Sequence, residues 1–217
     1  MKVGTDGVLL GAWANISDSK LICDVGTGTG LIALMAAQRN SIAHIVAVEI
    51  DEKASQQAKS NAQNSKWSER IEVIHSDFNE ISLLDKPDHF VSNPPYFEAE
   101  SLAKGKSRFT ARQNISLNLN QLLLKCKRLG ALKHLISLII PIELYETSIQ
   151  AFINYGYHLA RIRKVKTTPV KVPKRVLLEL RNHECELKQE KDLVIERERH
   201  VYTTEFIELN RNFYLKM

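Results

Sequence analysis

Short apolar runs alternate with amphipathic stretches through the first two-thirds of the chain. Each apolar run has the length of a strand buried on both faces, roughly 4–8 residues. The predicted strands are residues 21–26, 44–50, 70–77, 88–93 and 134–141. Apolar positions at helical spacing predict helices over residues 31–39, 52–65, 118–130 and 143–156. This alternation is typical of a parallel, doubly wound sheet in an α/β fold.

The pattern changes after residue 157. Two strand-like segments follow, at residues 157–168 and 174–181, and they are joined across "PVKVP". They predict an antiparallel hairpin at the end of the same sheet, which brings the sheet to seven strands. Residues 205–215 are apolar at helical spacing and predict a last helix. Because no linker rich in Gly or Ser divides the chain, we expect residues 1–217 to form a single domain.

Composition changes this picture only slightly. The chain has 217 residues, 44% hydrophobic and 25% charged, as is ordinary for a globular protein, and its net charge of +5 weakly favours an anionic partner. Three widely spaced cysteines argue against a disulfide framework or metal site and for a reducing compartment. No apolar run approaches about 18 residues and no signal-peptide layout is present, so we expect a cytoplasmic protein with no membrane or metal partner.

A glycine-rich segment follows the first predicted strand and precedes a helix. This glycine loop, "DVGTGTG" (residues 24–30), contains Gly26, Gly28 and Gly30. The glycines permit a tight turn and close approach of a ligand, although such a turn can also need glycine only for packing. Glu49 ends the next strand, where a carboxylate can accept hydrogen bonds from ribose hydroxyls. Because Asp24 suits a cationic ligand better than a pyrophosphate, the pattern favours S-adenosylmethionine over a dinucleotide.

The third predicted strand ends in "HSDF", residues 75–78. Asp77 could accept a hydrogen bond from an adenine amino group, with Phe78 packing on the ring. The alternative for Asp77 is a cap on a helix or turn.

The fourth predicted strand runs directly into "NPPYF", residues 93–97. Pro94 and Pro95 end sheet pairing because neither has an N–H group to donate. The Asn93 side-chain oxygen and the Pro94 carbonyl could both accept from a planar amine and so orient its lone pair. Tyr96 or Phe97 could stack on the ring that bears this amine. The alternative is a proline turn with core aromatics.

Together "DVGTGTG", "VEID", "HSDF" and "NPPYF" resemble the NPPY type of Rossmann-fold, S-adenosylmethionine-dependent methyltransferase, a class I methyltransferase fold. That type methylates amino groups conjugated to a planar system. Residues 1–13, 106–123 and 202–217 further resemble the bacterial valine-tRNA adenine-N6 methyltransferase family, which modifies the adenine 3′ of the anticodon. The resemblance implies adenine-N6 methylation of a tRNA. Separately, we expect the protein to be a monomer. Members of this family carry a leader before the segment that opens this chain, so a preceding leader is also expected.

The resemblance also assigns roles to single residues. Around the cofactor it places Thr5, Asp6, Asp24, Gly26, Gly28, Glu49 and Asp77, with Phe78 on the adenine ring. At the target amine it places the catalytic set Asn93, Pro94, Pro95 and Tyr96.

Basic residues concentrate in two segments. Residues 161–175, here called the basic hairpin, contain seven Lys or Arg and no acid: Arg161, Arg163, Lys164, Lys166, Lys171, Lys174 and Arg175. They predict a track for RNA phosphates, with a solvated edge that blocks aggregation as the alternative. Residues 104–112 add Lys104, Lys106, Arg108 and Arg112, with Phe109 between them, and as a loop they could clamp a flipped nucleotide.

Three other functions remain open on the sequence alone. A methyltransferase of a release-factor glutamine amide would use the same NPPY chemistry, but has less need of a basic hairpin. A DNA adenine methyltransferase would need a base-reading domain, for which 217 residues leave little room. A non-catalytic RNA-binding module would not require Asp24, Glu49 and Asn93 together.

Overall fold

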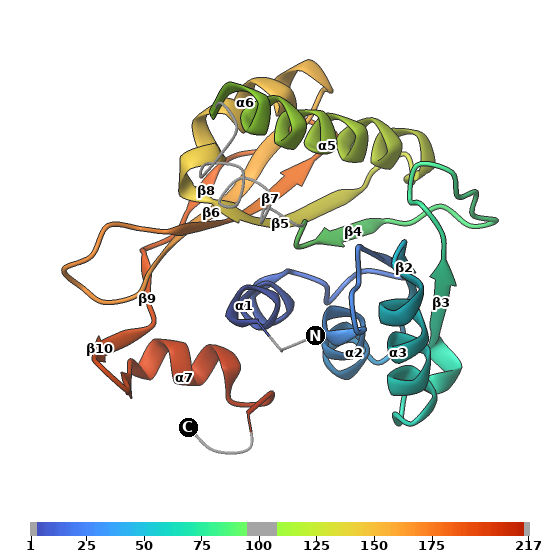
Figure 1. Cartoon of the computed structure of the whole chain (residues 1–217), viewed down its shortest axis with the longest axis horizontal. Helices are drawn as coiled ribbons and strands as arrows, with labels where there is room; N and C mark the ends of the chain where they lie inside the picture. Colours follow the sequence, from blue (N-terminus) through green and yellow to red (C-terminus); the bar gives the residue numbers. More distant parts are fainter. Residues whose placement is uncertain (1–3, 95–107, 215–217) are drawn as a thin grey trace.

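The computed structural model describes residues 4–94 and 108–214. One large sheet has α1, α2 and α3 on one face and α5 and α6 on the other, while α7 lies beyond α1 near the C-terminus (Figure 1). This three-layer arrangement matches the α/β alternation of the sequence.

Seven strands form the body of the sheet in the order β3-β2-β1-β4-β5-β7-β6. They are β1 (Leu21–Val25), β2 (His44–Glu49), β3 (Ile71–His75), β4 (His89–Ser92), β5 (Leu135–Pro141), β6 (His158–Lys166) and β7 (Arg175–Arg181). Pairing is parallel from β3 through β5, and β7 is antiparallel to both β5 and β6. The predicted doubly wound, mostly parallel sheet is therefore confirmed, with β7 inserted between β5 and β6.

Two further short strands cover the outer side of β6. β8 (Lys188–Gln189) and β9 (Leu193–Val194) pair with it in parallel, which makes the sheet nine-stranded. β10 (Glu196–Glu198) and β11 (Val201–Tyr202) form a separate ribbon. The basic hairpin therefore does not provide an open sheet edge, because the chain beyond it pairs with its first strand.

The helices are α1 (Thr5–Trp13), α2 (Leu31–Arg39), α3 (Glu52–Gln63), α5 (Arg108–Leu129), α6 (Tyr145–Asn154) and α7 (Thr204–Asn210), with short 3-10 turns at Ser68–Arg70 and Ile142–Leu144. Helix α3 begins where predicted because the Asp51 side chain caps it, accepting from the Ala54 N–H at 2.8 Å. Helix α5 begins ahead of the predicted residue 118, and α7 ends at Asn210 rather than 215.

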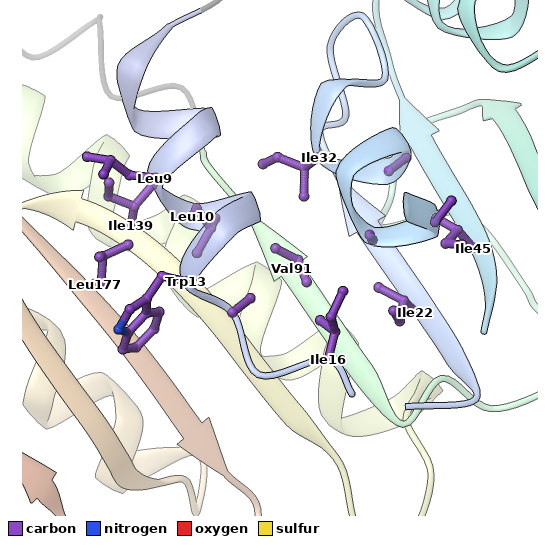
Figure 2. Packing of buried hydrophobic residues seen from close by; sticks show 14 of the residues in the cluster. Leu9, Leu10, Trp13, Ile16, Ile22, Ile32, Ile45, Val91, Ile139 and Leu177 are labelled. Carbon is purple, nitrogen blue, oxygen red and sulfur yellow. The ribbon is translucent and has the colours of Figure 1, made fainter. Parts of the chain in front are cut away.

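Helix α1 was not predicted from the sequence. Every residue from Gly7 to Trp13 is buried, so the helix has no polar face to create a helical period. Figure 2 shows why: Leu9, Leu10 and Trp13 pack against the sheet near Ile139 and Leu177. Fully burying such side chains contributes roughly 1.5–3 kcal/mol each, which offsets weak helical propensity. A second apolar cluster fills the opposite face, under α5 and α6. Within the described ranges, no helix is long and apolar enough to cross a membrane.

Candidate active site

The carboxyl ends of three neighbouring strands bring the candidate residues to one edge. Val25 at the end of β1 is level with Val48 on β2 and with Ser92 on β4. The next residue along each strand is Gly26, Glu49 or Asn93. Adjacent strands lie about 4.8 Å apart, so Glu49 and Asn93 start about 10 Å apart on either side of the glycine loop. This is the switch point of the sheet, where α/β folds bind ligands.

The backbone of the glycine loop turns over the end of β2. The N–H groups of Gly26 and Thr27 both donate to the Val48 carbonyl, at 2.9 and 3.0 Å. Gly26 has φ 70° and Gly30 φ 86°, in the left-handed region that favours glycine. A Cβ at Gly26 would meet nothing within 4 Å, whereas one at Gly30 would lie 3.4 Å from the Ala58 backbone. Glycine is therefore required at Gly26 by conformation, not by crowding, and the space above it remains open.

Asp24 lies beneath this loop and is only 1% exposed. Its Oδ2 accepts hydrogen bonds from the Thr27 hydroxyl and, at 3.0 Å, from the Ala33 N–H. Its Oδ1 is buried and accepts no hydrogen bond from the described residues. Burial raises the pKa of Asp24 to about 7, helped by the charge of Glu49 and opposed by the two hydrogen bonds. A buried carboxyl group with a free oxygen fits a cationic ligand, such as one that bears an ammonium and a sulfonium.

Glu49 holds its carboxylate rigidly at the end of β2. Oε2 accepts from the Gly28 N–H at 2.7 Å and Oε1 from the Asp51 N–H at 2.9 Å. Each oxygen keeps a further lone pair, so the group can still accept from ribose hydroxyls. The next residue, Ile50, is 65% exposed and offers apolar surface beside the carboxylate. Ile50 was not singled out from the sequence, although an apolar residue directly after an acidic strand end was a usable signal.

Asp77 and Phe78 follow β3 at the same edge. Asp77 Oδ1 accepts from the Asn79 N–H at 2.8 Å and the Asn79 amide at 3.1 Å, so the turn-cap alternative describes its present contacts. Phe78 packs edge-on against buried Phe90, with ring centroids 6.3 Å apart. Contact of either residue with an adenine ring stays a prediction.

Asn93 and Pro94 are half-buried directly after β4. The neighbouring Ser92 hydroxyl donates to the Val25 carbonyl at 2.8 Å and fixes the end of β4 to β1. This bond sets where Asn93 leaves the sheet, beside the glycine loop. Pro95, Tyr96 and Phe97 lie outside the described residues.

The first turn of α1 carries Thr5, which is exposed, and Asp6, which is half-buried. Asp6 Oδ2 accepts from Arg175 Nε at 2.7 Å. Asp6, expected at the cofactor, is thus paired with Arg175, expected on RNA. This contact was not predicted from the sequence.

Comparison with known proteins identifies the family. Residues 4–115 match the family model "Methyltransferase small domain". A tRNA1(Val) (adenine(37)-N6)-methyltransferase of Aliivibrio fischeri (strain MJ11) is 44% identical over 218 residues, which are 100% of this chain and 92% of the relative. A protein of the same name from Phocaeicola vulgatus is 44% identical over 219 residues, again 100% of this chain and 92% of the relative. The chain belongs to this methyltransferase family.

Solved structures agree on the fold. The methyltransferase superposes on a predicted O-methyltransferase of Agrobacterium tumefaciens with a TM-score of 0.73 at 18% identity, covering 95% of this chain and 96% of that one. TrmN from Thermus thermophilus gives a TM-score of 0.55 at 19% identity, with coverage of 80% and 47%. The protein is an S-adenosylmethionine-dependent methyltransferase with the class I fold. The buried oxygen of Asp24 that lacks a partner among the described residues and the fixed carboxylate of Glu49 fit that cofactor.

Two arginines of the basic hairpin are held inside the methyltransferase. Arg161 pairs with Glu190 at 3.0 Å and Glu179 at 3.2 Å, and its guanidinium lies 3.7 Å from the centre of the Trp13 ring. Arg163, 9% exposed, pairs with Glu205. These partners occupy the guanidinium groups that the sequence analysis expected to contact phosphates. All three acidic residues lie outside residues 161–175. The ion pairs therefore could not be predicted from the sequence of the hairpin alone.

The remaining basic residues differ in their surroundings. Lys166 pairs with Asp192 at 2.9 Å, whereas Lys164, Lys171 and Lys174 have no acidic partner within the described part of the chain. Lys171 and Lys174 are exposed in the connection from β6 to β7. Lys104 and Lys106 lie outside the described residues, as do the side chains of Arg108 and Arg112 at the start of α5. The binding role of all these residues stays a prediction.

Proposed function

We propose that this methyltransferase methylates the exocyclic N6 amine of adenine 37 in tRNA1(Val). The observation that carries the proposal is similarity over the whole chain, at 44% identity, to proteins of that name. A tRNA substrate is in keeping with the exposed lysines of the basic hairpin and with work in the cytoplasm.

The proposed cofactor site lies over the ends of β1 and β2. Glu49 accepts the ribose hydroxyls, the glycine loop gives the backbone room to approach, and Asp24 faces the cationic end. Thr5 and Asp6 border the methionine part, and Asp77 and Phe78 the adenine. When bound, S-adenosylmethionine supplies an electrophilic methyl group on its sulfonium.

The proposed amine site lies at the end of β4. An adenine amine is a weak nucleophile because its lone pair is conjugated with the ring. Asn93 and the Pro94 carbonyl accept its two hydrogens, which orients the nitrogen and favours the pyramidal geometry needed for attack. Pro95 stiffens this turn, and Tyr96 or Phe97 stacks on the base. The register that sets Asn93 beside the glycine loop supports this assignment.

RNA contacts are proposed along the same edge of the sheet. Arg175 at the start of β7 is level with Pro141 at the end of β5, so the β6–β7 connection emerges on the same side as Asn93. Lys164, Lys171 and Lys174 are the hairpin residues best placed for phosphates, with Lys104, Lys106, Arg108 and Arg112 as a second set. We expect one monomer to bind one tRNA.

The test is nucleoside mass spectrometry with isotopically labelled cofactor. Unmodified tRNA1(Val) should gain labelled N6-methyladenosine, and a matched transcript with guanine at position 37 should gain none. Label at another nucleoside would refute the site on the tRNA. Label in the glutamine of a release factor, with none in either tRNA, would refute the nucleic-acid substrate altogether.

A further inference from the structure

The first turn of α1 lies next to the glycine loop. A methyl group at Gly7 would lie 3.4 Å from Leu31 Cδ2, and one at Gly11 would lie 2.7 Å from Met35 Sδ. Leu31 is the first residue of α2 and follows Gly30 directly. A step of four residues along α1 therefore matches a step of four along α2, so the two helices run parallel in close contact. Their N-termini, and with them Asp6, are at the glycine-loop edge of the molecule.

Arg175 approaches this turn from the sheet. It is the first residue of β7, level with Pro141 on β5 and Val165 on β6, so it also lies at the carboxyl edge of the parallel strands. Its Nε donates to Asp6 Oδ2 at 2.7 Å, while Nη1 donates to the Lys174 carbonyl at 3.1 Å. The guanidinium thus spans from the start of the strand to the start of the helix, between residues 169 apart in sequence.

This ion pair is poorly suited to a purely stabilising role. Both side chains are 33% exposed, and ion pairs that exposed contribute little to global stability because water and salt screen them. It is well suited to a local role. The N-cap of α1, Gly4, makes no side-chain capping bond, and the N–H groups of a helix's first turn have no partners within the helix. Arg175 therefore restrains the first turn of α1, which no side chain of the N-cap residue holds in place.

We propose that Arg175 is a positioning residue for the cofactor, which holds the first turn of α1, with Thr5 and Asp6, beside the glycine loop. The inference rests on the cofactor placement of the proposed function. It reassigns Arg175 from the phosphate track, since its side chain already has an anionic partner within the protein. Through Arg175, β7, the strand that follows Lys171 and Lys174 in the chain, is linked to the methionine side of the cofactor site.

The experiment compares Arg175→Ala and Arg175→Lys with Lys174→Ala in the full-length enzyme. Lys174 is the adjacent exposed cation, so its replacement removes the same charge without the contact to Asp6. Calorimetry should show a cofactor Kd raised about two- to fivefold in Arg175→Ala, the range of a partly exposed ion pair. Lysine should restore the wild-type Kd to within about twofold, because a single nitrogen contacts Asp6. Lys174→Ala should leave the cofactor Kd unchanged.

A double-mutant cycle with Asp6→Asn tests whether Arg175 acts through Asp6. Because Asp6 also borders the cofactor, the double variant should bind the cofactor no more weakly than Asp6→Asn alone. Additive losses would overturn the inference, as would a weaker tRNA Kd and lower salt slope in Arg175→Ala with unchanged cofactor binding.

Glu49→Gln separates the two proposals. If it weakens cofactor binding while Arg175→Ala does not, only this inference fails. If neither changes the cofactor Kd, the cofactor placement itself is wrong.

Discussion

The glycine-loop region and the basic hairpin both hold charged residues that the sequence marks as functional, but they use charge in opposite ways. Beneath the loop, Asp24 is buried with one oxygen lacking a partner among the described residues. In the hairpin, Arg161 is partly buried between two glutamates and an indole ring. The loop region leaves a carboxylate oxygen without a partner among the described residues, which a ligand can use. The hairpin instead uses much of its positive charge in ion pairs that hold the C-terminal segment. A charge is available to a substrate only where the fold leaves it unpaired.

The same contrast appears in the titration of two buried acids. Burial raises the pKa of Asp24 to about 7, and no cation of the described residues lies close enough to oppose the rise. Burial also raises the pKa of Glu179, but there Arg161 acts against the rise. A cationic cofactor would do for Asp24 what Arg161 does for Glu179. The buried, unbonded oxygen of Asp24 is therefore the part of the loop region that suits a ligand.

The largest expected effect comes from the loop side of the comparison. Asn93→Ala should lower kcat about 100-fold or more, because the amine loses an aimed acceptor in the transition state. The cofactor Kd should not change, since the proposed partner of Asn93 is the amine and not the cofactor. Asn154→Ala, an exposed amide at the end of α6, is the matched control. A cofactor Kd that rises with unchanged turnover would move Asn93 to the cofactor site.

On the hairpin side, Arg161→Ala should destabilise the fold by about 2–4 kcal/mol, below the full value for a buried pair because Arg161 is 16% exposed. The cause is Glu179, whose charge would be left without its partner. Urea unfolding measures the loss, and Lys164→Ala, which breaks no ion pair of the described residues, should change stability by less than about 0.5 kcal/mol. Unchanged stability together with weaker tRNA binding would restore the phosphate-track interpretation for Arg161.

The pH dependence of cofactor binding sharpens the contrast between the two acids. Asp24 must be ionised to face a cation, yet its pKa of about 7 leaves it protonated in acid. As pH falls from 7, binding must first remove this proton, so the cofactor Kd should rise by about tenfold per pH unit. Above pH 7 this dependence should flatten. Asp24→Asn should bind weakly but without the slope below pH 7; a retained slope would mean that another group titrates.

The smallest expected effect concerns the exposed lysines. Replacing Lys171 and Lys174 together by alanine should lower the salt slope of tRNA binding by about 0.7–0.9 for each lost phosphate contact. Turnover at saturating tRNA should persist, since such contacts stabilise substrate and transition state alike. Titration of binding at several salt concentrations measures this. An unchanged slope would leave the hairpin with a structural role and move RNA binding to residues 104–112.

Local chemistry accounts for what could be predicted from the sequence alone. Strands covered on both faces are continuous apolar runs, so the parallel sheet was visible in the pattern. Glycines with positive φ leave a local signal, so the glycine loop was visible as well. Because parallel strands end at a common edge, the order of strands and loops along the chain is enough to group these segments into one site.

Only the tertiary structure decided the features that depend on distant partners. Helix α1 has no polar face, because sheet and helix bury it from both sides. The strands that cover β6 are two residues long, too short to carry a pattern. The ion pairs of Arg161 and Arg175 join residues far apart in the chain, and the attraction depends on distance in space and on burial. The sequence lists which charges exist, whereas the fold determines which of them remain free to bind.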